Sequence, residues 1–276
     1  MPRGYQQAPS FGFPRPGRAL RGVLIGLLAI WVVFAVGLNW GGASPAVFEA
    51  LTGSTSEILR GEIWRLFTAP LLHIPTGTVG HILFTLLGLY FLSPSLEREW
   101  GPKRFLKFLA VSAVFAYAFQ MALELALPGS VSAKLVPENW FGAGPVVSAV
   151  SIAWALTFRG RTLNLMFVIP VTSRGLIIFV VAVNIMYLLA ATQDTEGRLA
   201  PFGGMLAGWL FGSGSPSPIR RAWLGLRLAR LDAEARREAE ARRKRVAKSG
   251  LQVLEGGRSR DEDDDDVKKP PGGWLN

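Results

Sequence analysis

The chain has 276 residues, of which 50% are hydrophobic and 18% are charged, and its formal net charge is +10. The apolar residues gather in long runs that are apolar on nearly every side, which favours a protein of the lipid bilayer over a soluble globular domain. The absence of cysteine excludes disulfides, cysteine metal ligands and a thiol nucleophile, and the presence of only two histidines limits acid–base chemistry. We expect no metal site and no cofactor.

Residues 1–18 are rich in Pro, Gly and Gln and predict a disordered leader. Most of the apolar runs that follow approach the roughly 20 residues that a spanning helix needs. They predict an all-α polytopic membrane domain over residues 19–214, with a long first loop whose apolar clusters suit helices lying in the membrane interface. The predicted spans cover residues 22–40, 79–96, 106–127, 140–158, 175–193 and 199–213.

Lys and Arg alternate between the loops on the two sides of the predicted spans. The leader, the second loop and the fourth loop have four, four and three of them, whereas the first, third and fifth loops have two, one and one. This alternation predicts that the N- and C-termini are both cytoplasmic. Because the sequence has neither a sorting signal nor cysteine, we expect an integral protein of a bacterial plasma (inner) membrane.

The last quarter of the chain has a different character. It contains fifteen Lys and Arg residues, half of the total, interleaved with eleven Asp and Glu residues. Acidic residues placed four positions ahead of basic ones predict a basic cytoplasmic helix over residues 215–250, followed by a disordered acidic tail at 251–276. The helix is expected either to contact anionic lipid headgroups or to stand in solvent. The interleaved acids argue against a nucleic-acid partner.

Several short motifs follow one another at characteristic spacings. Residues 61–105 contain a Trp-Arg pair, two histidines and a Glu-x-x-x-Gly-x-x-Arg turn, and a Gly-Ala-Gly-Pro turn and an Ala-Pro-x-x-Gly-x-x-x-Gly helix come later. In this order they resemble the rhomboid family of intramembrane serine proteases over roughly residues 20–212. The positions that match the family's motifs are Trp64, Arg65, His73, His81, Glu97, Gly101, Arg104, Gly142, Gly204 and Gly208.

The resemblance implies a six-transmembrane-helix bundle and, in working members, a serine nucleophile with a histidine base on the last helix. Here Gly144 stands at the nucleophile position and Pro201 at the base position, and neither residue can attack a carbonyl or accept a proton. Thr85 replaces the asparagine that helps to bind the oxyanion in the family. We therefore assign no catalytic residue and predict a rhomboid-like pseudoprotease. It would bind transmembrane segments of client proteins in membrane-protein quality control or trafficking.

Two alternatives stay open. The chain could be an active rhomboid-type intramembrane serine endopeptidase with relocated chemistry, in which Ser148 or Ser151 is activated by His73 or His81. The simpler interpretation of these serines is a hydrogen bond between helices in the bilayer. The chain could also be a membrane scaffold that recruits a cytoplasmic partner through its tail.

Small and polar residues inside the predicted spans carry expectations about packing. Three glycines recur every four residues in the last span, and the resemblance implies that this face packs on the helix with Ala143, Ala149 and Ala153, with a homodimer as the alternative. Gln120 and Asn184 should face the bundle or a client helix, because unpaired amides are costly in hydrocarbon. Residues 164–171 indicate a short buried or interfacial segment.

Overall fold

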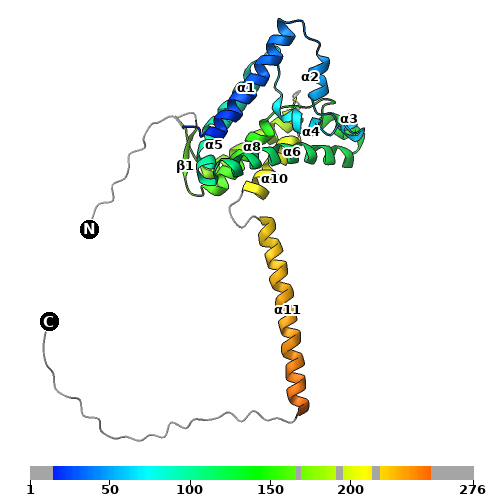
Figure 1. Ribbon diagram of the computed structural model, residues 1–276, viewed down its shortest axis with the longest axis vertical. Coiled ribbons are helices and arrows are strands. Elements are labelled where there is room, and N and C mark those ends of the chain that lie inside the picture. Colours follow the sequence, from blue (N-terminus) through cyan, green and yellow to red (C-terminus); the bar gives the residue numbers. More distant parts are fainter. Residues whose placement is uncertain (1–14, 166–168, 191–194, 213–217, 250–276) are drawn as a thin grey trace, which may run out of the picture. The chain divides into compact units, whose positions relative to one another are not determined.

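The computed structural model describes residues 15–165, 169–190, 195–212 and 218–249. Residues 1–14 of the predicted leader and all of the predicted acidic tail lie outside these ranges. The chain divides into two units, Met1–Trp223 and Leu224–Asn276. In the first unit, the described residues form helices and one short hairpin (Figure 1).

A helix lies at each of the six predicted spans. Three of these helices, α1, α6 and α9, are long and apolar enough to cross a membrane, and α8 is a shorter apolar helix. The predicted class, a mainly helical protein with membrane-spanning segments, is therefore confirmed. The six helices are α1 (Arg18–Asn39), α5 (Gly80–Trp100), α6 (Pro102–Ala126), α8 (Gly144–Thr157), α9 (Ser173–Ala190) and α10 (Ala200–Gly212).

The fourth of these helices begins later than the sequence predicted. Residues 140–143 are not helical, because Trp140 pairs with Gly53 of the first loop in an isolated antiparallel bridge. The N–H of Gly142, two residues later, donates to the carbonyl of Ala69 at 3.0 Å. Gly142 has a φ of 134°, which is readily accessible only to glycine. Helix α8 therefore starts at Gly144, directly after the non-helical residues 140–143, which we call the strap.

The first loop is folded around the Trp-Arg pair. The buried guanidinium of Arg65 donates to the carbonyls of Glu49 and Thr52 at 2.6 and 2.8 Å and pairs with Glu62 at 2.6 Å. The indole N–H of Trp64 donates to a main-chain carbonyl of α2 at 3.2 Å. These motif residues thus have a structural role. The short helices of the loops are α2 (Ala46–Leu51), α3 (Thr55–Leu59), α4 (Arg65–Thr68), the 3-10 turn η1 (Ala69–Leu71) and, in the third loop, α7 (Gly129–Leu135).

The Glu-x-x-x-Gly-x-x-Arg turn joins three helix ends. The buried carboxylate of Glu97, near the end of α5, accepts hydrogen bonds from the N–H groups of Ala19 and Leu20 at 3.0 and 3.2 Å. It thereby caps α1, where a negative charge is favoured by the helix dipole. Gly101 has a φ of 79° and ends α5, and the Arg104 guanidinium lies 5.1 Å from the ring centroid of the last α5 residue.

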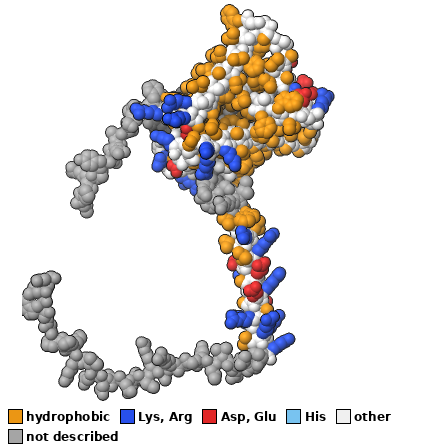
Figure 2. Space-filling model, viewed as in Figure 1, with side chains coloured by type: hydrophobic (Ala, Val, Ile, Leu, Met, Phe, Trp, Pro, Cys, Tyr) orange, Lys and Arg blue, Asp and Glu red, His pale blue; other side chains and the backbone are white. Residues whose placement is uncertain are grey.

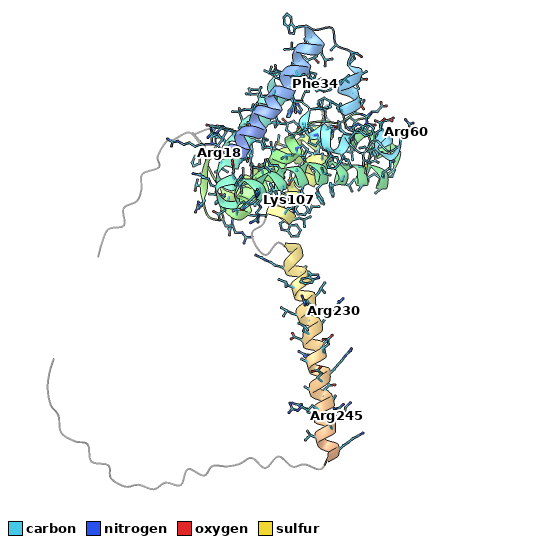
Figure 3. The ribbon with its side chains drawn as sticks, viewed as in Figure 1. Arg18, Phe34, Arg60, Lys107, Arg230 and Arg245 are labelled. Carbon is cyan, nitrogen blue, oxygen red and sulfur yellow. The ribbon has the colours of Figure 1, made fainter. Side chains whose placement is uncertain are left out.

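Charge and apolar surface are segregated on the first unit. On the face shown in Figure 2, hydrophobic side chains cover most of the described surface, and most of the basic side chains gather near one end, with a small group of basic and acidic side chains on the opposite side. Figure 3 labels two residues of this end, Arg18 at the start of α1 and Lys107 in the first turns of α6, whereas Phe34 lies toward the other end of α1. This distribution is typical of a helical bundle whose flanks face lipid.

Helices α8 and α10 pack backbone to backbone. A Cβ added to Gly204 would overlap the carbonyl oxygen of Pro145, and one added to Gly208 would overlap that of Ala149. A Cβ added to Gly212, the third glycine of this row, would overlap Ala153. The contacts advance by four residues on both helices, so α8 and α10 run parallel. The predicted packing of the glycine face is confirmed, and the contact lies within one chain.

A β-hairpin follows α8, which the all-α prediction missed. Strands β1 (Thr162–Leu165) and β2 (Ile169–Thr172) pair antiparallel, with Thr162 opposite Thr172. Each strand has only four residues, too few for a periodic pattern to separate it from a loop. The predicted buried or interfacial segment at 164–171 falls mostly within this hairpin, and residues 166–168 lie outside the described ranges.

The second unit contains most of helix α11 (Pro218–Ser249), 32 residues long. It lies within the range where the sequence predicted a basic helix. Its described side chains are exposed, and basic and acidic groups alternate along it in Figure 2. Arg230 and Arg245 are labelled in Figure 3.

Candidate functional site

The structure brings Gly144 and Pro201, the predicted nucleophile and base positions, to the same end of the bundle. Gly144 is the first residue of α8, and Pro201 is the second residue of α10. Pro201 lies about one turn before Gly204 on the same helix face, and Gly204 contacts the first turn of α8. Pro201 is therefore buried level with the start of α8. Neither residue offers a nucleophile or a base.

A carboxylate that sequence reasoning missed occupies this place. Oε1 of Glu196 accepts the N–H of Gly144 at 2.7 Å and lies 3.1 Å from Nε2 of His81. Glu196 is only 8% exposed. A Cβ built on Gly144 would overlap Oε2 of Glu196, and one built on Gly142 would overlap Oε1. The Glu196 carboxylate thus fills the space into which a side chain at position 144 would extend.

The hydrogen bonds of His81 define which of its ring nitrogens carries a proton. Nδ1 accepts the N–H of Ile74 at 3.3 Å, so in the neutral ring the proton lies on Nε2. Nε2 then donates to the Glu196 carboxylate. His81 is therefore a hydrogen-bonded group within the bundle, and its only basic nitrogen is already engaged by the backbone.

The helix start adds to the attraction for the anion. The N–H groups of Val146 and Val147 donate to the carbonyl of Ala143 at 3.0 and 3.1 Å, and the helix dipole makes this end partially positive. Gly144 supplies the N–H, and the following Pro145 has none to offer. One amide and one imidazole therefore converge on one carboxylate oxygen.

His73 is the second histidine of the site. Its side chain is 1% exposed, its ring centroid lies 5.0 Å from that of His81, and neither of its ring nitrogens has a hydrogen-bond partner among the described residues. Burial, together with the nearby His81, lowers the pKa of His73 to about 3, although the backbone of Leu71 acts in the opposite direction. His73 is thus neutral at pH 7 and is a weak base.

The strap before α8 is fixed from both sides. The N–H of Phe141 donates to the carbonyl of Thr195 at 2.7 Å, which places the residue next to Glu196. The hydroxyl of Tyr117 donates to the carbonyl of Gly142 at 2.7 Å, and its ring stacks on Trp140 with centroids 4.4 Å apart. The main-chain bond between Phe141 and Thr195 therefore holds Glu196 beside this segment.

Gln120 of α6 positions the last helix. Its Oε1 accepts the N–H of Ala200, the first residue of α10, at 2.9 Å. Gln120 is fully buried and faces the bundle, as predicted. The amide replaces a capping side chain at a helix start that is buried away from water.

Three other polar residues form hydrogen bonds within their own helices. The hydroxyl of Thr85 donates to the carbonyl of His81 at 3.0 Å. Because this bond uses the hydroxyl proton, Thr85 does not serve as an oxyanion donor in place of asparagine. The hydroxyl of Ser151 donates to the carbonyl of Val147 at 2.7 Å, and the predicted bond between helices is wrong for this residue. The amide of Asn184 donates to a carbonyl one turn earlier at 2.7 Å. Ser148 is buried in α8.

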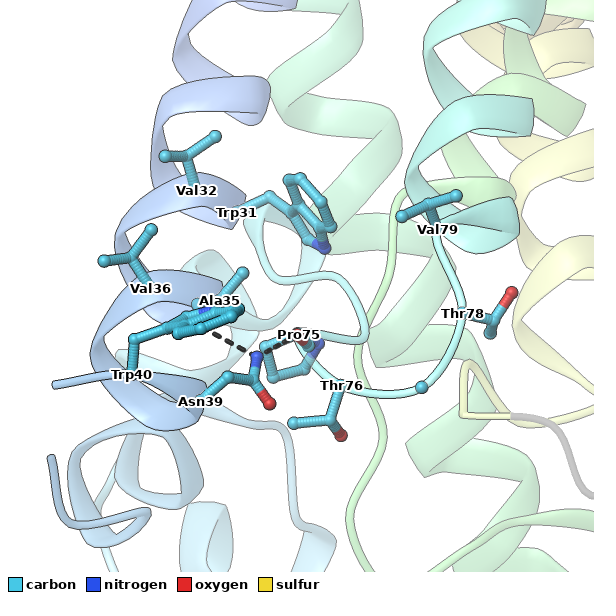
Figure 4. A pocket seen from close by; sticks show the side chains of 11 residues that line it. Trp31, Val32, Ala35, Val36, Asn39, Trp40, Pro75, Thr76, Thr78 and Val79 are labelled. Atoms are coloured by element: carbon cyan, nitrogen blue, oxygen red, sulfur yellow. Dashed lines mark hydrogen bonds between the residues drawn. The ribbon is translucent and has the colours of Figure 1, made fainter. Parts of the chain in front are cut away.

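One cavity lies beside the site, and a second lies near the end of α1. One of about 440 Å³ is lined by Phe141 and Thr195, the residues that flank the strap, together with apolar residues of α1 and the first loop. The other, of about 330 Å³, lies between the end of α1 and the loop before α5 (Figure 4). There the amide of Asn39 bridges the carbonyls of Ala35 and Pro75 at 2.7 and 3.0 Å.

Glu196 had a signal in the sequence that could have identified it. It is an acidic residue five positions before Pro201, in a short connection between two apolar helices. A carboxylate that follows a spanning helix and precedes a buried one needs a partner, because an unpaired buried charge is costly. The start of α8 and His81 meet this requirement for Glu196.

The chain is similar to proteins that are named as rhomboids. It is 28% identical to the rhomboid protease GlpG of Enterobacter sp. (strain 638) over 210 residues, which are 75% of this chain and 66% of the relative. It is 27% identical to RHOMBOID-like protein 12, mitochondrial, of Arabidopsis thaliana over 158 residues, 55% of this chain and 46% of the relative. The chain thus spans about half to two thirds of these relatives. Residues 60–215 match the Rhomboid domain, and the chain belongs to this family of integral membrane proteins.

Proposed function

We propose that this chain is a rhomboid-family pseudoprotease that binds transmembrane segments of other membrane proteins without hydrolysing them. The observation that carries the proposal is the Glu196 carboxylate at the start of α8. It accepts a hydrogen bond from the N–H of Gly144 and fills the space that a side chain at that position would occupy. An oxyanion that formed there would meet an occupied donor and a negative charge, whereas hydrolysis needs free donors at that point.

The bases that hydrolysis would need are also engaged. Pro201 has no titratable group, and Nδ1 of His81 accepts a backbone N–H. His73 has a pKa lowered to about 3, mainly by burial, so it would hold a proton too weakly to activate a hydroxyl at neutral pH. The hydroxyl of Ser151 is bonded within its own helix. These observations favour binding over relocated catalysis.

We propose that clients approach between α5 and α9. Both helices pack on α8, and both expose large apolar side chains, among them Phe84 at 67% and Phe179 at 53%. An apolar client helix in the bilayer would pack against such side chains through close van der Waals contact. Asn184 already bonds within α9, so we assign it no client contact.

Site-specific photo-crosslinking in native membranes tests client binding. Crosslinking amino acids at Phe84 and Phe179 are expected to capture other membrane proteins. The matched control is Val33 of α1, which is apolar and 68% exposed and should give only lipid adducts. If adducts form equally at all three positions, or only around Arg236 of α11, the bundle has no client surface there and the scaffold function is favoured instead.

We also propose that all six helices cross the bilayer, that both termini are cytoplasmic and that the membrane is a bacterial inner membrane. The support is the charge alternation of the loops and the basic end of the bundle seen in Figure 3. The name of the Arabidopsis relative places that protein in mitochondria.

For α11 we propose contact with anionic headgroups, since its exposed surface has both basic residues and large apolar ones such as Trp223 and Leu226.

A further inference from the structure

We infer that the groove between α1 and α5 is a binding site for an anionic phospholipid, with an acyl chain in the groove and the phosphate beside Arg18 and Arg21. The inference goes beyond the proposed function, because such a lipid would be bound whether or not the chain binds clients. It requires only that the chain is a membrane protein.

The groove has the size and lining of a site for a hydrocarbon chain. Its volume is about 370 Å³. The lining residues on α5 run from Leu83 to Tyr90, about 10 Å along the helix axis. A client helix of about 10 Å diameter would fill roughly 800 Å³ over that length, so the groove suits a single acyl chain better. On α1 the groove is lined by Leu24, Ile25 and Leu28.

The groove opens where lipid would contact the protein. Helix α1 is long and apolar enough to cross a membrane, and it packs on α5. Three of the residues that line the groove, Ile25, Leu28 and Leu83, have exposed side chains. In a bilayer these side chains would be covered by hydrocarbon, and the groove gives that hydrocarbon a fixed position.

Two arginines continue the face of α1 that lines the groove. Arg21 lies three positions before Leu24 and four before Ile25, and Arg18 lies three positions before Arg21, so the side chains form one stripe. The arginines lie about 4.5 and 9 Å beyond Leu24 along the helix axis. Both are exposed, and Arg18 is labelled at this end of α1 in Figure 3.

The phosphate would be bound by these side chains and not by the start of α1. The N–H groups of Ala19 and Leu20 already donate to the buried carboxylate of Glu97. The Nε of Arg21 donates to the carbonyl of Pro16 at 3.2 Å, which turns the guanidinium away from the groove and toward the end of the bundle. A guanidinium there can bind phosphate oxygens through parallel N–H groups.

The combination of groove and arginines selects the ligand. Basic residues beside a cleft between membrane helices are typical of sites for anionic lipid headgroups. The apolar groove requires an acyl chain, which free phosphate lacks. The two adjoining positive charges favour a lipid with net negative charge over a zwitterionic one.

Photo-labelling of the full-length chain in liposomes tests the site. The liposomes contain phosphatidylcholine and a small fraction of phosphatidylglycerol with a diazirine in its acyl chain, and adducts are mapped by mass spectrometry after digestion. Adducts at Ile25 and Leu28 are compared with those at Val33, which lies outside the groove on the same helix and is 68% exposed. Unlabelled phosphatidylglycerol should lower the groove adducts more than an equal amount of phosphatidylcholine does. At Val33 the two lipids should compete equally.

Two double variants test the role of the arginines. Arg18→Gln with Arg21→Gln should lower the ratio of groove adducts to Val33 adducts about fivefold for each arginine removed. The matched control is Lys103→Gln with Lys107→Gln, which removes the same charge from exposed residues of α6 and should leave the ratio unchanged.

Two results would overturn the inference. Equal competition by the two lipids at the groove would mean that ordinary boundary lipid covers it. Equal losses in the two double variants would mean that the total charge at this end, and not the arginine stripe, attracts the lipid. The competition experiment uses the wild type, so it does not depend on the folding of any variant.

Discussion

The carboxylate of Glu196 lies 2.7 Å from the amide nitrogen of Gly144, and its second oxygen fills the space beside this residue, which has no side chain. The two residues are 52 positions apart in the sequence. An acidic side chain and a glycine are thus complementary in shape and in hydrogen bonding. The space beside Gly144, which has no side chain, is therefore filled by the Glu196 carboxylate and is not a cavity.

Restoring a serine at position 144 should therefore destabilise the protein. In Gly144→Ser the new Cβ would overlap the Glu196 carboxylate, and overpacking of this kind costs about 1–3 kcal/mol. Combining it with Glu196→Ala should relieve part of that cost, so the two changes should be non-additive in a double-mutant cycle. Denaturant unfolding in detergent measures the cycle.

Gly129→Ser is the matched control for this change. Gly129 has no atom within 4 Å of an added Cβ, so its substitution should leave the free energy of unfolding nearly unchanged. If Gly144→Ser is as stable as this control, or if its effect adds to that of Glu196→Ala, the two side chains do not compete for one space.

The glycine face of α10 should tolerate no methyl group. Gly204→Ala places a Cβ on the carbonyl oxygen of Pro145, and we expect a loss of about 2 kcal/mol or more, because two backbones would have to separate. Gly26→Ala is the control, since an added Cβ on that residue of α1 meets no atom within 4 Å. Equal thermal stabilities of the two variants in detergent would contradict the packing of α8 on α10.

Stability should depend on pH through His73. Its folded-state pKa of about 3 lies below the ordinary value of 6.5, so the unfolded chain binds a proton more readily between these values. This contribution to stability is fully present above pH 6.5 and is lost as the pH falls toward 3, by up to about 1.4 kcal/mol per pH unit.

Comparison with His73→Gln isolates this contribution from that of the acidic residues. The difference in unfolding free energy between the wild type and the variant should be constant above pH 6.5 and should change steadily below it. Parallel pH profiles for the two proteins would mean that His73 titrates normally in the folded state.

The proposed topology predicts which positions a reagent can reach from outside the cell. The chain has no cysteine, so a single introduced thiol is labelled without background. Ala133→Cys, in the exposed part of α7, should react with an impermeant maleimide on intact cells. Lys103→Cys, exposed at the start of α6, should react only after the membrane is opened. The opposite pattern would reverse the orientation inferred from the loop charges.

The positions of the long helices could be predicted because each leaves a run of apolar residues in the sequence. The face of α10 that packs on α8 could also be predicted, since small residues at four-residue spacing allow two helices to approach closely. The starts of α8 and α6 were misplaced by about four residues. Local apolarity does not reveal that Trp140 pairs with Gly53 or that Pro102 begins a helix.

The candidate site was predicted only in part, because its decisive contacts join distant segments. The sequence identified Gly144, His81 and Pro201 through their motif positions, but it gave no partner for them. Glu196 belongs to none of the motifs, and its role depends on the main-chain bond between Phe141 and Thr195 that places it. The partners of Glu97 were likewise hidden, since they lie 77 and 78 residues away along the chain.

The most direct test of the account is a cleavage assay with the purified full-length protein. The protein is incubated in detergent and in liposomes with a transmembrane substrate that an active rhomboid protease cleaves, and products are measured by mass spectrometry beside labelling by a fluorophosphonate probe. We expect no product and no labelling above those of a Ser148→Ala, Ser151→Ala double variant, because Gly144 and Pro201 provide neither nucleophile nor base. Cleavage or labelling that exceeds this background and is lost in the double variant would contradict the account and establish a relocated serine protease.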